Sequence, residues 1–340
     1  MTGLLVQQIG PACSLQDLGR PGYLDRGLSC GGAADVLALH EGAALLGQSP
    51  GCAALEMSGL GGRFVAQQHL RIALTGAPMQ AVLDDKSLIW NASYAMRAGQ
   101  VLSIGGARAG VYGYLHVGGG FDAPQILGSR AAHLTAGIGE LVQAGDALAI
   151  CPDPGGPVGQ RLPEQARFAG GPLRVLAGFQ TPLFAQDVQD RFQTANFQRA
   201  ARANRMGVQV EAPGQGFAAQ GQLNVLSEII VPGDIQMTGD GQPFVLMSEC
   251  QTTGGYPRIG TVLPCDLPLI AQAPLGTPIR FQYVDRAAAM TAQAAFEAHL
   301  QGLRGKVQPL LRSPAEIGGL LSYQLISGAI SATAGMEDWG

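Results

Sequence analysis

Short stretches in which apolar and polar residues alternate recur along the chain, with glycine between them. Clear examples are Leu70–Leu74, Val111–Val117 and Ile279–Tyr283. Alternation with a period of two is typical of β-strands that bury one face, and glycine between such strands favours tight turns. Because many short strands joined by glycine turns indicate barrels or sandwiches, we expect a mainly β fold.

Helical patterns are fewer. The segment Ala34–Leu46 has Asp35 in its first turn and is followed by Gly47, which favours a helix end. Thr181–Phe192 opens with a Thr-Pro pair, and proline is well accepted in the first turn of a helix. Asp285–Leu303 is rich in alanine, the strongest helix former. We therefore expect a few helices beside the strands.

The clearest boundary in the chain is the segment Cys151–Gly159, which is made largely of proline and glycine. This composition suits neither a helix nor a sheet ladder and predicts a linker. A new strand pattern, Leu173–Leu176, begins soon afterwards. We therefore expect an N-terminal β domain over residues 1–160 and a C-terminal β domain over residues 161–340. The second domain carries a terminal helix and a loose tail of small and polar residues at 331–340.

The charge pattern removes several classes of function. The 340 residues carry a formal net charge of −4, and their 21 basic residues include only two lysines, Lys86 and Lys306. The acidic balance and the lack of a Lys/Arg cluster argue against a nucleic-acid surface. Neither lysine lies in a glycine loop of the P-loop type or beside a methionine, the setting in which biotin is attached. We therefore expect neither a Walker-type nucleotide site nor a biotin-carrier lysine.

Six cysteines are scattered without the short pair spacing of a zinc site or a redox pair: Cys13, Cys30, Cys52, Cys151, Cys250 and Cys265. Reduced thiols are the rule inside cells. The N-terminus lacks the features of a secretory leader, and no apolar run approaches the length of a membrane span. We therefore expect a cytoplasmic protein with no metal site of its own and no membrane contact.

The most distinctive polar segment is Gln251–Arg258, which follows the apolar run Phe244–Met247. It places an amide, hydroxyls, a phenol and a guanidinium around the pair Gly254–Gly255. A buried strand that ends in such a segment holds polar groups in a fixed place, and the glycines let a ligand approach the backbone. Near the N-terminus, Ser14–Tyr23 has a similar mixture. The alternative is that the segment is only a polar turn.

Four arginines lie beside glycine or proline turns: Arg20, Arg130, Arg205 and Arg258. The guanidinium fork suits planar carboxylates and phosphates, because it offers two parallel charge-assisted hydrogen bonds. The alternative is that each arginine holds its own loop by donating to backbone carbonyls.

A further polar element is Ile235–Pro243, which contains Asp240 and Gln242. Asp240 fits a general base or a carboxylate that faces Mg²⁺, and Asp-Gly is also a common hairpin turn. The sequence leaves both interpretations open.

Taken in order, eight segments of the chain resemble the biotin-dependent carboxyltransferase family. This family contains the C-type component of 5-oxoprolinase, the Kip antagonist proteins and the carboxyltransferase-type half of urea carboxylase that is related to allophanate hydrolase subunit 2. The segments cover most of the chain, and the last is the most specific. They are Gln16–Tyr23, Ala73–Ala77, Gly118–Asp122, Leu127–Arg130, Ala136–Gly139, Asn204–Gly207, Asp240–Pro243 and Gln251–Ile259.

The resemblance implies two cyclophilin-like β-barrel domains and a smaller, B-type (Kip inhibitor-like) partner that shares a composite cleft with this chain. With an A-type subunit, such a complex opens the cyclic amide 5-oxoproline to glutamate using ATP. The implied function is the C-type subunit of this ATP-dependent hydrolase, with ATP and Mg²⁺ at a site shared with a partner. The same family allows two alternatives. One is a carboxyltransferase that acts on a urea-like amide, with biotin on a separate carrier. The other is a non-catalytic regulator of the Kip antagonist type.

The matching segments also imply two sets of site residues. In such a cleft an arginine holds a substrate carboxylate or a phosphoryl group, amide and hydroxyl donors stabilise a developing oxyanion, and Asp17 acts as orienter or base. The catalytic candidates are Asp17, Arg20, Gln251, Thr252, Tyr256 and Arg258. The substrate-binding candidates are Arg130, Arg205, Asp240, Gln242, Gly254 and Gly255.

Five positions depart from the usual family pattern. Family members usually have Ser-Gly-Ala-Met-Asp where this chain has Gly31–Asp35, and an asparagine where it has Ala43. Glu249 replaces the aspartate that usually precedes Gln-Thr-Thr. Ser227–Ile229 replaces the usual Ser-Asp-Gly, and Gly178–Gln180 replaces the usual Gly-Pro-Gln. Loss of polar groups around a retained glycine frame implies an altered substrate or a diverged relative.

Overall fold

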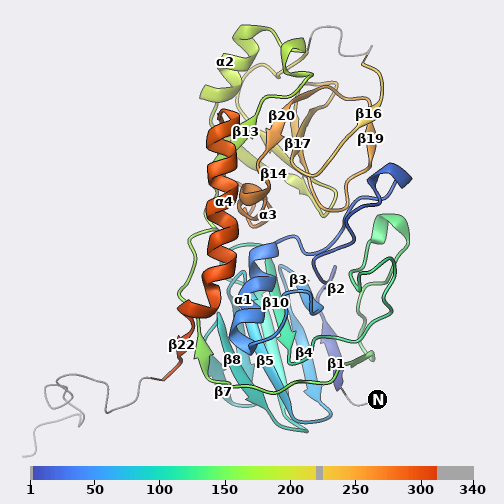
Figure 1. Ribbon diagram of the computed structural model, residues 1–340, viewed down its shortest axis with the longest axis vertical. Helices are drawn as coiled ribbons and strands as arrows, with labels where there is room; N and C mark the ends of the chain where they lie inside the picture. Colours follow the sequence, from blue (N-terminus) through green and yellow to red (C-terminus); the bar gives the residue numbers. More distant parts are fainter. Residues whose placement is uncertain (1–2, 220–224, 312–340) are drawn as a thin grey trace, which may run out of the picture.

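The computed structural model describes residues 3–219 and 225–311. These residues form a mainly β structure, as predicted, with one long helix that runs along its side (Figure 1). The tail expected at residues 331–340 lies outside the described residues.

The N-terminal half of the chain builds two antiparallel sheets. The six-stranded sheet has the order β11 (Ala147–Ala149), β1 (Gly3–Ile9), β4 (Gly62–Ala66), β9 (Val101–Ala107), β6 (Met79–Leu83) and β7 (Lys86–Leu88). The seven-stranded sheet has the order β2 (Ser14–Gln16), β3 (Ala54–Ser58), β10 (Tyr112–Val117), β5 (Leu70–Gly76), β8 (Ala92–Met96), β12 (Gln160–Arg161) and β22 (Gln308–Pro309).

The two sheets share one apolar core, to which the first contributes Leu4 and Phe64 and the second Leu55 and Leu74. A closed barrel was expected here, and the described residues instead form two open sheets. The reason lies at the edges: β2, β7 and β11 have three residues each, and β22 has two. Strands this short cannot carry a ladder long enough to close the sheets onto each other.

The C-terminal half forms a closed seven-stranded barrel. Its order is β13 (Gly171–Leu176), β20 (Arg258–Val262), β17 (Asp234–Met237), β18 (Pro243–Leu246), β15 (Gly207–Glu211), β14 (Phe197–Ala203) and β21 (Pro278–Tyr283). Phe192 packs inside it against Phe197, Phe217 and Phe281, at ring-centroid distances of 4.8–5.5 Å. Outside the barrel, β16 (Glu228–Ile229) and β19 (Thr253–Gly254) pair as a separate two-stranded ribbon.

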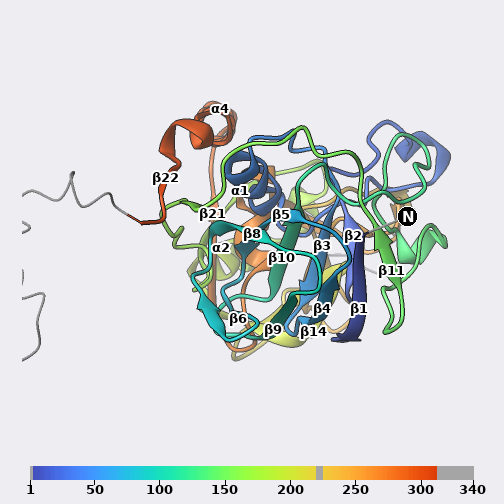
Figure 2. The same cartoon turned by 90° about the horizontal axis from the view of Figure 1, so that it is seen from below.

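Two of the predicted helices form close to their predicted limits. They are α1 (Val36–Leu46) and α4 (Arg286–Gly302), each with an aspartate side chain as N-cap. Helix α1 ends at Gly47 in the left-handed conformation and lies over the seven-stranded sheet (Figure 2). The other helices among the described residues are α2 (Gln186–Thr194), α3 (Leu267–Ala271) and the 3₁₀ turns η1 (Leu24–Arg26), η2 (Leu134–Ala136), η3 (Thr181–Leu183), η5 (Pro264–Asp266) and η6 (Leu303–Lys306).

The third predicted helix, Thr181–Phe192, is interrupted. It splits into the 3₁₀ turn η3 and helix α2, because Phe184 adopts an extended backbone with ψ 126°. The extended backbone buries the Phe184 side chain, which is 1% exposed, in the core that the barrel shares with the N-terminal half. Tertiary packing therefore overrides the local helical pattern.

The segment Cys151–Gly159, which was predicted to be a linker, has neither helix nor strand. The two halves are nevertheless in close contact. Tyr112 and Tyr114 of the seven-stranded sheet belong to the same buried cluster as the barrel interior. Arg167, which follows this segment, pairs with Asp35 at 2.7 Å and with Glu41 at 2.6 Å, and all three residues are buried.

Candidate functional site

A cavity of about 570 Å³ lies on the outer face of the barrel. Strands β14, β15, β17 and β18 form its floor, and residues from Cys250 to Tyr256 contribute to one wall. Alternation in β17 explains the floor: Ile235 and Met237 are fully buried in the barrel core, so Gln236 between them points outward. Cavities of about 300–1,000 Å³ are the usual size of small-molecule sites.

Gln236 is the most unusual residue of this cavity. It is only 8% exposed, and its side-chain nitrogen has no hydrogen-bond partner among the described residues. The ribbon passes directly over it, because a Cβ built on Gly254 would lie 2.5 Å from the Gln236 Nε2 atom. Burial of an amide donor without a partner is rare in folded proteins. Gln236 is therefore a buried amide whose nitrogen has no partner among the described residues, in the lining of the cavity.

The predicted segment Gln251–Arg258 contributes two side chains to the cavity, Gln251 and Tyr256. Tyr256 is 51% exposed, so its phenol is accessible to solvent. Thr252 does not line the cavity. Its carbonyl accepts from the Ile230 N–H at 3.0 Å, and its hydroxyl lies 4.0 Å from the position that a Cβ on Gly27 would occupy. Gly255 is exposed beside this ribbon.

Arg258 lies on β20 directly opposite Gln236, but its guanidinium is already occupied. It donates to Glu228 at 2.5 Å, to the Ile229 carbonyl at 2.7 Å and to Asp234 at 3.2 Å. These contacts fasten β16 of the ribbon onto the barrel. The Arg258 side chain therefore holds one wall of the cavity in place.

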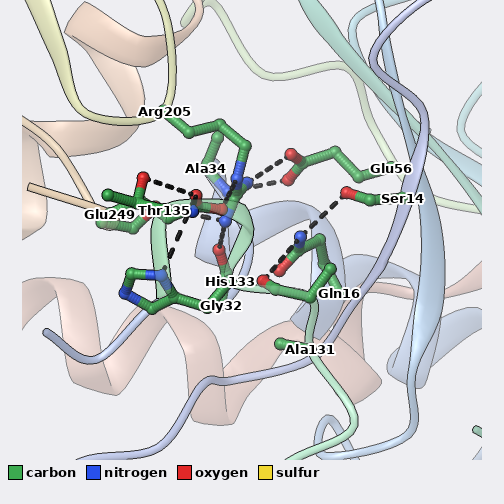
Figure 3. A network of polar contacts seen from close by, with 12 residues as sticks. Ser14, Gln16, Gly32, Ala34, Glu56, Ala131, His133, Thr135, Arg205 and Glu249 are labelled. Carbon is green, nitrogen blue, oxygen red and sulfur yellow. Dashed lines mark hydrogen bonds and ion pairs between the residues drawn. The ribbon is translucent and has the colours of Figure 1, made fainter. Parts of the chain in front are cut away.

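Arg205 joins the two halves of the molecule. Its guanidinium contacts Glu249 of the barrel half and Glu56 of β3, both at 2.5 Å, and also the Gly32 carbonyl at 2.5 Å (Figure 3). The two carboxylates raise the Arg205 pKa, against the opposing effect of burial. Glu249 also accepts from Thr135, at 3.4 Å. Arg205 thus lies in the interface, although its neighbours Asn204 and Met206 line the cavity.

In the N-terminal motif, Asp17 is buried and fully bonded. Its carboxylate accepts from the Gly19 N–H at 2.8 Å, the Ser129 hydroxyl at 2.6 Å and the Arg130 N–H at 2.6 Å. Arg20 is 1% exposed and donates to the carbonyls of Ile126 and Ala131. These two residues shape the loops of the N-terminal half.

The other predicted residues lie at the surface. Arg130 pairs with Asp122 at 3.0 Å on the N-terminal half. Asp240 is exposed and accepts from Thr238 in the turn between β17 and β18, where Gly241 N–H donates to the Thr238 carbonyl at 2.8 Å. Asp240 and Gln242 line a second hollow, on the other side of this turn. The Asp240-Gly241 pair therefore lies in a turn.

The segment that follows the N-terminal motif Ser14–Tyr23 lies beside the wall of the cavity. The Gly31 N–H donates to the Ser248 carbonyl at 2.9 Å, and Gly27 faces Thr252. Of the twelve predicted residues, the fold brings Gln251, Gly254 and Tyr256 together around Gln236. The sequence analysis missed Gln236 and Arg202, an exposed residue of β14 that lines the same cavity. For Gln236 the signal was a polar residue between two apolar ones in the strand that leads to Asp240.

Two further observations concern metal ligands and membrane-spanning helices. Within the part of the chain that the structure describes, no three His, Cys, Asp or Glu side chains are grouped as a metal site would require. No helix in the described ranges has the length and apolar character of a membrane span.

Comparisons with known proteins give a consistent result. Residues 26–283 match the family model for the carboxyltransferase domain, subdomains A and B. The chain is 36% identical over 299 residues to the C-type subunit of the 5-oxoprolinase of Haemophilus influenzae, covering 86% of this chain and 94% of that protein. It is 35% identical over 283 residues to the corresponding 5-oxoprolinase subunit of Escherichia coli, covering 82% and 90%.

Among solved structures, that of TTHA0988 superposes with a TM-score of 0.74 at 30% sequence identity. The match covers 83% of this chain and 56% of TTHA0988, so the chain spans just over half of that protein. The family model covers most of the chain, and the curated relatives match it over nearly their whole length. The chain therefore belongs to the family of carboxyltransferase domains with subdomains A and B.

Proposed function

We propose that this chain is the C-type subunit of a 5-oxoprolinase, a hydrolase that opens a cyclic amide. The observation that carries the proposal is the 36% identity to the C-type subunit of another 5-oxoprolinase across 94% of that relative's length. Because the match extends over nearly the whole relative, it concerns the complete subunit and not one shared module.

The subunit works with a B-type partner and an A-type subunit in the cytoplasm, and the complex converts 5-oxoproline to glutamate with ATP. The cavity on the outer face of the barrel is this chain's contribution to the composite cleft. Two features support the assignment: the cavity is lined by Gln251 and Tyr256 of the most specific family segment, and it opens to the surface, where a partner can complete it. The cyclophilin-like nature of both halves, each a domain, belongs to the same proposal.

We place the ATP site, with its Mg²⁺, at a surface shared with a partner. In this chain Lys86 is exposed on the short strand β7, and Lys306 contacts His299 at 3.0 Å. The amides of Gly118, Gly119 and Gly120 already donate to Arg71, Gln48 and Val117. These groups therefore do not form a ready phosphate cradle. We derive no step of the reaction through the nucleotide.

A second candidate function is a biotin-dependent carboxyltransferase. The observation that favours it is the match to a carboxyltransferase-domain family model over residues 26–283. This function needs a biotinylated carrier protein and a urea-like amide as acceptor.

One experiment separates these functions. The chain is mixed with its B-type and A-type partners and given ATP with 5-oxoproline. A parallel reaction receives urea, bicarbonate, a biotinylated carrier and a biotin carboxylase. We expect glutamate only when 5-oxoproline, ATP and this chain are all present. Carboxylation of urea without glutamate formation would replace the proposal by the carboxyltransferase. A stable complex that is inactive in both reactions would favour a regulatory binding protein.

A further inference from the structure

We infer that Gln236 and Arg202 recognise the substrate in the outer cavity: Gln236 binds the ring amide of a small lactam, and Arg202 binds its carboxylate. The inference rests on the proposed function for the identity of the lactam, 5-oxoproline. The site itself rests on the residues that line the cavity.

The first step is the unmet hydrogen bond of Gln236. The residue lines the cavity, is only 8% exposed and has a side-chain nitrogen without a partner among the described residues. The Gln236 Nε2 atom lies under Gly254 and has almost no exposed surface. Because the terminal amide of glutamine turns about a soft torsion, a turn of this amide would present its oxygen and nitrogen together to the cavity. A ligand that offers both an acceptor and a donor would satisfy the Gln236 side chain.

The second step concerns the shape of that ligand. A primary amide carries its C=O and one N–H side by side on the same edge. The amide of a small ring is held cis, so its C=O and N–H also lie on one edge. The two edges are complementary and form two parallel hydrogen bonds, whereas an open-chain trans amide presents these groups on opposite sides. Gln236 is therefore suited to a lactam.

The third step is the charge and polarity of the walls. Among the described residues that line the cavity, Arg202 is the one with a charged side chain. It is exposed, near the end of β14. It can pair with a carboxylate by two hydrogen bonds. Ile230, Phe244 and Leu246 supply apolar surface for ring methylenes. A ring with an amide, a carboxylate and two methylenes has one group for Gln236, one for Arg202 and one for the apolar surface.

The fourth step is the role of Gly254. A Cβ at this position would lie 2.5 Å from Gln236 Nε2 and 3.1 Å from Ile230 Cδ1, so only glycine leaves the Gln236 amide where it is. Gly254 does not adopt a positive φ, and an alanine there displaces Gln236 without straining the backbone. Gly254 is thus a positioning residue for Gln236.

The test measures binding by titration calorimetry, with the chain in complex with its B-type partner. The probes are 5-oxoproline, 2-pyrrolidinone, which lacks the carboxylate, and proline, which lacks the ring carbonyl. We expect Gln236→Leu to weaken binding of 5-oxoproline by about tenfold or more, the effect of one to two hydrogen bonds. Gln282→Leu, the same substitution at an exposed position on strand β21 of the same barrel, should leave binding unchanged.

Two further variants, at Arg202 and Gly254, change ligand binding in ways that a merely structural role of these residues would not produce. Arg202→Gln should weaken binding of 5-oxoproline and leave binding of 2-pyrrolidinone unaffected. Gly254→Ala should weaken binding in the parent protein and have no added effect when Gln236 is already leucine. Gly239→Ala, whose Cβ would meet nothing within 4 Å, is the matched control.

The outcomes separate this inference from the proposed function. If the complex forms glutamate and Gln236→Leu matches the parent in binding and in KM for 5-oxoproline, the inference is wrong and the proposed function stands. If no glutamate forms but lactam binding depends on Gln236, the site stands and the proposed function fails. Equal effects of Arg202→Gln on 5-oxoproline and 2-pyrrolidinone would overturn the assigned role of Arg202.

Discussion

At the scale of single residues, three of the arginines that lie beside glycine or proline turns in the sequence hold loops in place. Arg20, Arg205 and Arg258 each donate to a backbone carbonyl, which was the alternative stated for them. The sequence located the loops correctly, because glycine turns and guanidinium groups are visible in it. It could not reveal the acidic partners, since Glu56 lies 149 positions from Arg205.

Gln236 escaped prediction for a related reason. A polar residue between two apolar ones in a strand is usually an ordinary solvent-facing residue. Its special character arises only when the ribbon, a distant part of the chain, passes over it and leaves its amide nitrogen without a partner among the described residues. Burying such a group costs about 1–3 kcal/mol of stability, a cost that binding of a ligand would offset.

This cost gives a prediction for stability. Gln236→Leu should equal or exceed the parent in free energy of unfolding, by up to about 2 kcal/mol, because it removes an unpaired amide and keeps the side-chain volume. The measurement is chemical denaturation of the parent and the variant side by side. A loss of more than about 1 kcal/mol would mean that the Gln236 amide has a structural partner.

Arg205 gives the opposite prediction. Arg205→Met leaves the carboxylates of Glu56 and Glu249 buried without their cation, and should cost about 3–5 kcal/mol in free energy of unfolding. Adding Glu56→Gln and Glu249→Gln should recover part of this loss. Arg130→Met, which breaks a more exposed pair with Asp122, is the control and should cost at most about 1 kcal/mol. Equal losses in the two arginine variants would contradict the role of Arg205 as a buried link.

At the scale of secondary-structure elements, the fit of α1 on the sheet depends on one glycine. A Cβ on Gly42 would lie 2.4 Å from ring atoms of His116 on β10. Burial lowers the pKa of His116 to about 3, so the ring is neutral, and its Nε2 lies 2.7 Å from the Thr75 hydroxyl. That hydroxyl donates to the Ala38 carbonyl of α1 at 2.9 Å. Helix, strand and histidine therefore form one tightly packed unit.

This packing predicts that the same substitution has opposite effects in two helices. Gly→Ala normally stabilises a helix by about 1 kcal/mol. Gly302→Ala, at the end of α4 with nothing within 4 Å of its Cβ, should do so. Gly42→Ala should destabilise the protein by about 1–3 kcal/mol or more, because the His116 ring must move. Thermal unfolding of both variants checks the pair. A stabilised Gly42→Ala variant would show that α1 packs less closely on β10.

Helices and strands were predicted correctly where neighbouring residues in the sequence determine them. Helices α1 and α4 follow from their caps and composition, and both formed. The segment from Thr181 to Phe192 carried a helical pattern but broke at Phe184, whose burial against the rest of the core outweighs local propensity. The open N-terminal sheets depend on strand lengths at their edges, which the alternation pattern does not specify.

At the scale of the whole molecule, the structure places the most specific family segment on the outer face of the barrel, open to a partner. Gly27, which follows the N-terminal motif Ser14–Tyr23, faces Thr252 of this segment and does not line the cavity. The N-terminal half therefore contacts one wall of the cavity.

The most direct measurement is the amount of phosphate and of glutamate formed by this chain with its B-type and A-type partners, with ATP, in the presence and absence of 5-oxoproline. We expect equal amounts of the two products, both dependent on 5-oxoproline, and loss of both when this chain is omitted. Glutamate formed at the same rate without this chain, or a stable complex that forms no glutamate, would contradict its role in a 5-oxoprolinase.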